Sequence, residues 1–271
     1  MPATDTCYLV FDIESVADGA LVSRLRYPGE DLSPEKAIAR YRGELQAETG
    51  KDFIPYTYQL PISLVVARVA KDLSLLDLTA LDEEQSRPHE IVRRFWEGWR
   101  HYGRPRLVSF NGRGFDLPLL ELGAFRYGIQ IPDWFAEGSR NFDQPRYRYN
   151  TAAHLDLHEW LTNSGASRFT GGLSLAANLI GKPGKMDVAG HMVQELWEAG
   201  RVAEIHAYCR SDVLDTYFVF LRSRVVAGDI TLAREQALID EAREWIAERA
   251  ADSPGLEKYL AAWGEWVNPW P

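Results

Sequence analysis

The sequence predicts an α/β fold in which a mixed β-sheet is flanked by helices. Strand-like apolar runs alternate with amphipathic helical patterns in the first part of the chain, and helical patterns alone follow. The 271 residues, 46% of them hydrophobic, suffice for one large domain with an elaboration or for two small domains. We therefore expect one main α/β domain, at 1–228, and a helical C-terminal extension packed on it, at 229–271.

The first part of the chain predicts a strand, a helix and a hairpin. The apolar run CYLVFDIE, residues 7–14, is typical of a buried strand. In the helix that follows, Ser33 is the expected N-cap, Pro34 the first helical residue and Gly50 the stop. Two strand-like runs are then expected to pair as a hairpin, at 61–70 and 74–81.

The remaining elements complete the α/β pattern. Ile91, Phe95 and Trp99 form the apolar line of a helix at 88–103. Strands are expected at 106–112 and at the start of 153–161, separated by a helix that ends at Gly128. Helices alone follow, at 174–181, 191–200, 204–226 and 234–250.

Composition and charge narrow the classes of function. The formal net charge of −9 argues against a protein that coats nucleic acid through a broad basic face, although a local grip on a strand end is compatible with it. The N-terminal segment lacks the features of a signal peptide, and no apolar run approaches a membrane span. Two isolated cysteines fit a reducing compartment. We expect a cytoplasmic protein with no membrane partner.

The helix at 204–220 carries polar groups beside its buried face. Its apolar stripe follows a 3.6-residue period, and a second line at i, i+4 and i+7 holds Tyr208, Asp212 and Asp215. Burying charge is costly, so carboxylates at this margin need an explanation.

Four acidic residues fall at the predicted ends of elements. Asp12 and Glu14 flank Ile13 and share one face of the first strand, which places them at its C-terminal end. Asp116 opens a helix, and Asp212 lies on the helix described above. Each has an ordinary explanation on its own, such as a solvated strand edge or a helix cap. Together, carboxylate oxygens from several elements suit Mg²⁺ or Mn²⁺ rather than zinc.

Three ordered motifs give these acids a context: FDIES, SFNGRGFDLPLL and YCRSDVLDTY. The sequence resembles DEDD-type 3′–5′ exonucleases of the ribonuclease-H-like (DnaQ-like) superfamily, nearest the proofreading domain of family-B DNA polymerases and the stand-alone bacterial polymerase-B-like exonucleases. The resemblance runs from about Cys7 to Thr231. It implies a ribonuclease-H-like fold and two Mg²⁺ or Mn²⁺ ions bound by Asp12, Glu14, Asp116 and Asp212.

The third motif also implies a catalytic tyrosine. Tyr208 stands four residues before Asp212, where the family's tyrosine subtype (DEDDy) orients the attacking water. The histidine subtype would need histidine at Ala207, and His206 is one residue off. Residues interleaved with the acids are expected near the terminal nucleotide: Ile13, Ser15, Asn111 and Phe115.

The resemblance implies a metal-dependent hydrolase that removes 5′-mononucleotides from single-stranded or frayed 3′ ends, with DNA the expected polymer and DNA repair a matching process. Two alternatives stay open. RNA trimming uses the same acids, and discrimination would rest on contacts to the 2′-OH. A catalytically silent binding or assembly module could retain the fold. The sequence leaves the oligomeric state and the role of the C-terminal extension open.

Two further patterns have weaker functional interpretations. Lys182 and Lys185 in GKPGK could reach a phosphate, but a solvated loop is the simpler interpretation. His154, Asp156 and His158 would share one strand face and could suggest zinc. Because no further zinc ligand is near, a structural role is favoured for these residues. Asp156 could support the metal site through contacts to its ligands, without binding the metal itself.

Overall fold

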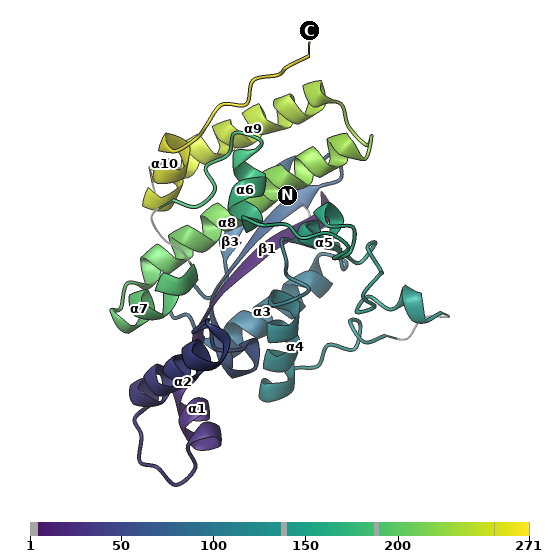
Figure 1. The fold of residues 1–271 in the computed structure, drawn as a ribbon. Helices are drawn as coiled ribbons and strands as arrows, with labels where there is room; N and C mark the ends of the chain where they lie inside the picture. The colour runs from purple at the N-terminus through teal and green to yellow at the C-terminus, as the bar shows by residue number, and fades with distance from the viewer. Residues whose placement is uncertain (1–4, 137–139, 187–189, 252, 271) are drawn as a thin grey trace.

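Five strands form one sheet in the computed structural model of the chain, which describes residues 5–136, 140–186, 190–251 and 253–270 (Figure 1). The order across the sheet is β3-β2-β1-β4-β5. The bounds are β1 Thr6–Ala17, β2 Gln59–Ala70, β3 Leu75–Ala80, β4 Arg106–Ser109 and β5 His154–Asp156.

The sheet is mixed, as the sequence predicts. β1 lies at its centre, antiparallel to β2 and parallel to β4, while β3 and β5 form the two edges. The antiparallel ladder with β2 runs to Ala17, whereas the parallel pairing with β4 ends at Val10 and Val108. One edge of β1 therefore lacks a partner strand beyond Val10.

Helices cover both faces of the sheet (Figure 1). On one face, α8 (Val202–Val226) packs on β1 and β2. Val10 and Val65 belong to the core cluster on that face, together with residues of α8. The other face holds α3 (Pro88–His101) and α4 (Asp116–Tyr127), whose apolar side chains pack on Leu9, Phe11 and Ile13. The alternation of β1 residues between two cores explains why its stretch from Tyr8 to Phe11 is apolar on both faces.

The helical termini follow their local signals. Ser33 accepts a hydrogen bond from the Lys36 amide at the start of α2 (Pro34–Thr49), and Gly50 ends it with φ of 72°. These features confirm the predicted cap, first residue and stop. Gly128 likewise ends α4 in the left-handed conformation. α1 (Gly19–Arg26) was not predicted; it pairs with α2 beyond one end of the sheet (Figure 1).

The C-terminal part shares the main hydrophobic core. α9 (Leu232–Ala250) and α10 (Pro254–Ala261) pack on α8, and Leu238, Ile246 and Tyr259 are fully buried there. Core side chains from both sides of residue 228 form one cluster, so no separate hydrophobic core marks a boundary there. The division at residue 228 stays a prediction. The other helices are α5 Leu157–Leu161, α6 Gly172–Asn178 and α7 Val193–Glu198, with single 3₁₀ turns at Tyr56–Tyr58, Asn141–Asp143 and Gly190–Met192.

Among the described residues, no helix has the length and apolar character needed to cross a membrane.

Candidate metal centre

The first two acids lie on the central strand and face α8. Asp12 and Glu14 alternate with Ile13, which packs into the core on the opposite face of the sheet. They lie within β1 rather than at its end, contrary to the prediction, because the ladder with β2 continues to Ala17. What ends near them is the parallel pairing with β4.

The long helix α8 brings a third acid to the same place. One carboxylate oxygen each from Asp12, Glu14 and Asp212 all lie within 4.8 Å of one another. Glu14 is 8% exposed, and the other two side chains are half-buried. The donors are oxygens only, and their separation suits a hard divalent cation. The residues present therefore fit a Mg²⁺ or Mn²⁺ site.

Asp116 is not one of the three acids within 4.8 Å of one another, but its charge raises the pKa of both Asp12 and Glu14, so it lies beside them. It is the first residue of α4; the N-cap is Phe115, and no side chain caps the helix. The Asp116 carboxylate accepts hydrogen bonds from its own amide and from the backbone N–H of Ile13. Asp116 thus uses the edge of β1 that β4 leaves unpaired. An ordinary helix-capping role does not describe this residue.

A glycine makes room for that approach. A Cβ on Gly112 would lie 2.3 Å from Ser109 Oγ and 3.1 Å from Asp116 Oδ2. Leu117 donates a hydrogen bond from its amide to the Gly112 carbonyl, which holds the first turn of α4 against the end of β4. The position of Asp116 therefore depends on the absence of a side chain at 112.

The four carboxyl groups destabilise one another's charged forms. Burial, followed by the charges of Asp116, Glu14 and Asp212, raises the pKa of Asp12 well above its usual range. Burial and the charges of Asp212 and Asp116 do the same for the pKa of Glu14. Burial also raises the pKa of both Asp116 and Asp212 to about 7. So concentrated a negative charge calls for a cation.

Tyr208 completes the centre from α8. Its hydroxyl donates a hydrogen bond to the Asp212 carboxylate, one helical turn away. Burial and the charges of Asp212, Glu14 and Asp12 raise the pKa of the phenol, so the proton stays on the tyrosine. The ring is 9% exposed and packs in a cluster with Val16 and Ile205.

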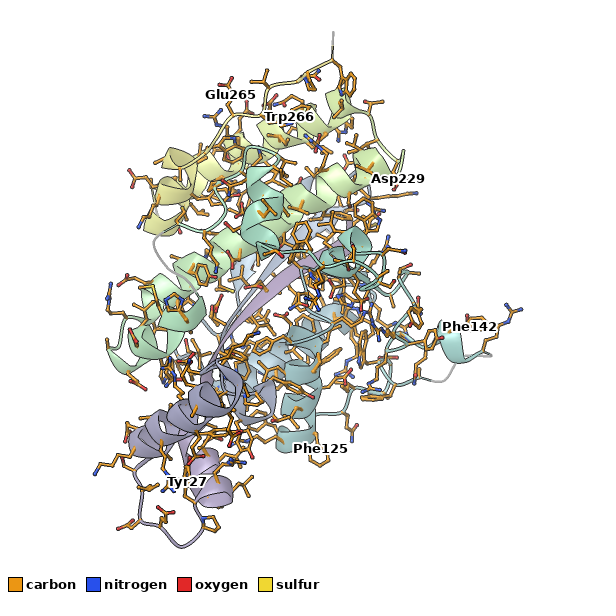
Figure 2. The ribbon with its side chains drawn as sticks, viewed as in Figure 1. Tyr27, Phe125, Phe142, Asp229, Glu265 and Trp266 are labelled. Atoms are coloured by element: carbon orange, nitrogen blue, oxygen red, sulfur yellow. The ribbon has the colours of Figure 1, made fainter. Side chains whose placement is uncertain are left out.

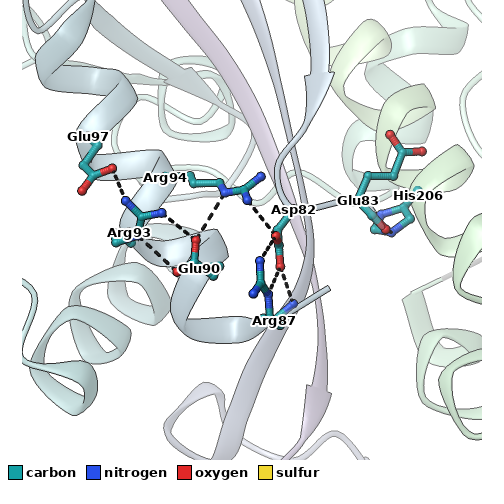
Figure 3. A network of polar contacts seen from close by, with 8 residues as sticks. All are labelled: Asp82, Glu83, Arg87, Glu90, Arg93, Arg94, Glu97 and His206. Carbon is teal, nitrogen blue, oxygen red and sulfur yellow. Dashed lines mark hydrogen bonds and ion pairs between the residues drawn. The ribbon is translucent and has the colours of Figure 1, made fainter. Parts of the chain in front are cut away.

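His206 lies away from the acids. Its Nδ1 is 2.8 Å from Ser63 Oγ, and its Nε2 is 3.1 Å from Ser86 Oγ. The same Nε2 is 3.2 Å from the carbonyl oxygen of Glu83, which Figure 3 shows beside the imidazole. Burial lowers the pKa of this imidazole, which favours its neutral form. The histidine therefore anchors the loop after β3 to α8.

Asp215, the third polar residue of the α8 line, has a structural environment. It is fully buried, and its Oδ1 accepts a hydrogen bond of 2.7 Å from the Tyr259 hydroxyl. Burial raises its pKa to about 7. Asp215 therefore connects α8 to α10 and is not part of the acidic group.

The loop that leads to Asp116 is held by Asp156. Asp156 Oδ1 accepts a hydrogen bond from the Asn111 amide, and Asp156 Oδ2 accepts one from the Arg113 amide, each at 2.9 Å. The same carboxylate caps α5 through the amides of His158 and Glu159. Its charge raises the pKa of Asp116, after the larger effect of burial.

The expected common strand face of His154, Asp156 and His158 is wrong. β5 ends at Asp156 because this residue caps α5, and His158 belongs to that helix. His154 is fully buried, and its Nε2 lies 2.8 Å from Ser109 Oγ. Burial lowers the pKa of this imidazole well below its usual range. These contacts support the structural role expected for His154.

The residues expected near a terminal nucleotide have different surroundings. The Ile13 side chain is 5% exposed and packs into the core on the face of the sheet opposite the acids. Only its backbone contacts the centre, because its amide donates a hydrogen bond to the Asp116 carboxylate. Asn111 has φ of 65° and borders a cavity with Arg113. Ser15 borders a second cavity. The Phe115 ring is half-buried.

An aromatic side chain beside Phe115 was missed in the sequence. Phe53 is 60% exposed, its ring centroid lies 5.8 Å from that of Phe115, and it lines the same cavity as Ser15. The isolated aromatic residue in KDFIP, between two predicted elements, was the only local sign of it.

The two lysines of GKPGK have separate environments. Lys185 is exposed, and its charge lowers the pKa of both Glu14 and Asp212, so its ammonium acts on the acidic group. Lys182 is 5% exposed and lies over aromatic rings of Phe218 and Trp263. A solvated loop is therefore the wrong description for Lys182.

The chain is similar in sequence to a described protein family and to a DNA polymerase. Residues 51–263 match the model of a family described as predicted 3′–5′ exonucleases related to the exonuclease domain of PolB. Asp116, Tyr208 and Asp212 lie inside the matched segment, whereas Asp12 and Glu14 precede it.

A DNA polymerase from Pyrococcus glycovorans is 29% identical over 142 residues, which cover 50% of this chain and 18% of the polymerase. The chain thus spans less than a fifth of that relative's length.

Proposed function

Because the chain belongs to the family of predicted 3′–5′ exonucleases related to the PolB exonuclease domain, we propose that it hydrolyses single-stranded or frayed 3′ ends, releasing 5′-mononucleotides. DNA is the proposed polymer. The observation that carries the proposal is the convergence of acids from β1, α4 and α8 on one centre.

Each side chain has a defined task in this proposal. Asp12, Glu14, Asp116 and Asp212 hold the divalent ions. Two such ions supply activation of water and stabilisation of the leaving oxygen when bound. The Tyr208 hydroxyl, a weak acid in this environment, orients the attacking water rather than removing its proton. The Lys185 ammonium offsets negative charge where the phosphate enters.

The surroundings of the centre favour a strand end over a closed duplex. The exposed Phe53 ring and its neighbour Phe115, next to Asp116, offer an apolar surface to a base. The cavity that Asn111 and Arg113 border gives a path for the rest of the strand. Closed circular single strands should accordingly resist cleavage.

The test is incubation with 5′-labelled linear single-stranded DNA, the matching RNA and circular single-stranded DNA. Each substrate is assayed with Mg²⁺, with Mn²⁺ and with chelator. We expect a descending ladder on linear DNA that requires metal and is abolished in Asp12→Asn and Asp212→Asn. Glu84→Gln, which changes an exposed carboxylate that is not part of the acidic group, is the matched control.

Faster trimming of RNA than of DNA would reassign the polymer. Binding of linear strands without cleavage under every metal condition would identify a silent binding module instead. Rapid cleavage of circles would contradict the requirement for a 3′ end.

A further inference from the structure

A cavity of about 430 Å³, different from the two described above, lies between α8, α9 and the tryptophan-rich segment after α10. None of the four acids of the metal centre lines it. Three cations do, Lys182, Arg222 and Arg243, together with the indole rings of Trp263 and Trp266. Figure 2 labels Trp266 where the C-terminal segment runs back alongside α9.

Lys182 is the most unusual of these cations. Its side chain is 5% exposed, yet within the described parts of the chain its ammonium makes no hydrogen bond and no ion pair. The Nζ atom lies 4.5 Å from the ring centroid of Trp263 and 5.2 Å from that of Phe218. Burial lowers the pKa of Lys182 to about 8. The charges of Glu235 and Asp215 also act on this ammonium, but neither carboxylate accepts a hydrogen bond from it, so its three N–H donors stay available.

The two arginines are held in a similar way. The Arg222 guanidinium lies 4.3 Å from the Trp266 ring centroid, and only its Nε donates to Glu235, at 2.7 and 2.9 Å. Arg243 lies over Trp263 at 5.5 Å and has no ion pair among the residues that the structure describes. By contrast, Arg87 donates hydrogen bonds from its Nε and Nη2 to the Asp82 carboxylate. The cavity therefore presents cationic N–H groups that no carboxylate occupies.

The C-terminal segment is fixed against the wall of the cavity. Gly181 has φ of 69°, and a Cβ there would lie 2.6 Å from the Trp266 nitrogen and 2.7 Å from the Glu265 carbonyl carbon. Such close approach of two backbones requires glycine at 181. The segment therefore has a defined seat beside Lys182.

Two carboxylates also border the cavity, so the lining carries three cations and two anions. Asp240 is exposed and accepts a hydrogen bond from Gln236 Nε2 at 2.9 Å, and Glu265 is exposed. The unused cationic donors favour an anion with several acceptor oxygens, for which phosphate is the common biological example.

We propose that this cavity is a phosphate-binding site, separate from the metal centre, with Lys182 and Arg243 as its main donors. The phosphate can come from a nucleic-acid strand, from a free 5′-mononucleotide or from inorganic phosphate. Binding of phosphate in this cavity does not require hydrolysis. The binding test therefore gives a result whether or not the chain has the proposed exonuclease activity.

Calorimetric titration of the full chain in chelator tests the proposal. The probes are inorganic phosphate, 5′-dAMP and a single-stranded oligodeoxynucleotide. We expect saturable binding of at least one probe with a Kd at or below about 1 mM. Lys182→Met keeps an apolar stem on Phe218, and Arg243→Gln keeps a polar side chain; each should weaken binding by roughly tenfold, as loss of a charged hydrogen bond does.

Arg249→Gln is the matched control, because Arg249 also lies on α9 over a tryptophan, Trp245, but does not line the cavity. It should change the Kd by less than about twofold, as expected for an exposed charge. If Lys182→Met unfolds, as judged by circular dichroism, the exposed Arg243→Gln decides alone.

Comparing the three probes identifies the source of the phosphate. Absence of saturable binding by all three, or equal effects of Arg243→Gln and Arg249→Gln, would overturn the site.

Discussion

The hydroxyl of Tyr208 donates a hydrogen bond to the carboxylate of Asp212, one turn further along α8. Asp212 shares its oxygen cluster with Asp12 and Glu14 on the central strand. The phenol is therefore one hydrogen bond from the point where the acids converge. This relationship explains why α8 carries polar groups beside its buried face.

Tyr208→Phe should lower the rate of exonucleolytic cleavage by up to about 100-fold, because it removes one positioned hydroxyl and leaves the acids intact. The free energy of unfolding should change by no more than about 1 kcal/mol, since the ring keeps its packing. Single-turnover assays and thermal unfolding measure the two effects. Tyr217→Phe is the control on the same helix: it loses a hydrogen bond to the Leu73 carbonyl and should keep full activity. A wild-type rate in Tyr208→Phe would make Tyr208 a packing residue only.

Stability without metal should fall as pH rises from about 4 to about 7. Asp116 and Asp212 have a pKa of about 7 in the folded protein against 3.8 normally. In that interval the folded protein holds protons that the unfolded chain has released, so raising the pH favours unfolding. Thermal unfolding in chelator at pH 5.5 and pH 8 measures this. The double variant Asp12→Asn/Asp212→Asn should flatten the dependence.

Divalent metal should reverse this loss. Mn²⁺ or Mg²⁺ at 100 times its Kd stabilises a protein that binds it only when folded by about 2.7 kcal/mol. The increase in Tm should be larger at pH 8 than at pH 5.5, because metal binding requires deprotonated carboxylates. An equal increase in wild type and in the double variant would place the metal elsewhere.

Gly112→Ala should impair catalysis by displacing Asp116. The new Cβ would lie 2.3 Å from Ser109 Oγ, so the turn before α4 must shift. A shift of about 1 Å at a catalytic group typically costs about 100-fold in rate. Gly43→Ala is the control, because a Cβ at this site in α2 meets nothing within 4 Å. It should leave activity unchanged and stabilise the helix by roughly 0.5–1 kcal/mol. Full activity in Gly112→Ala would show that Asp116 tolerates displacement.

Asp82→Asn should destabilise the fold without affecting cleavage. The buried Asp82 carboxylate accepts bonds from Arg87 N, Nε and Nη2 and pairs with Arg94 (Figure 3). Losing this charge should cost about 1–3 kcal/mol in chemical denaturation. Asparagine tolerates the left-handed backbone at 82, where φ is 54°. Asp77→Asn, which alters a more exposed pair with Arg68, should cost less than about 1 kcal/mol.

The contribution of Asp82 has the opposite pH dependence to that of the metal centre. The hydrogen bond from Arg87 is the main cause that lowers the pKa of Asp82 to about 2. This stabilisation is therefore complete above pH 4 and is lost as the pH falls toward 2. Wild type and Asp82→Asn should differ most above pH 4 and converge below it; a constant difference would exclude the ionic origin.

The sequence by itself determined the elements and the candidate acids. Periodicity and caps are local, so α2 begins and ends at the predicted signals, and α8 ends at the predicted Val226. Alternation along β1 likewise set the shared face of Asp12 and Glu14. These features depend on the conformation of neighbouring residues alone.

Only the tertiary structure decided which groups surround those acids. The bond from the Ile13 amide to Asp116 depends on where β4 stops pairing with β1, a property of strand register. The influence of Lys185 on Glu14 and the contact of Phe53 with Phe115 join residues far apart in sequence. The seat of the C-terminal segment on Gly181 is of the same kind. No local pattern encodes such contacts, because they form only when distant segments pack into one core.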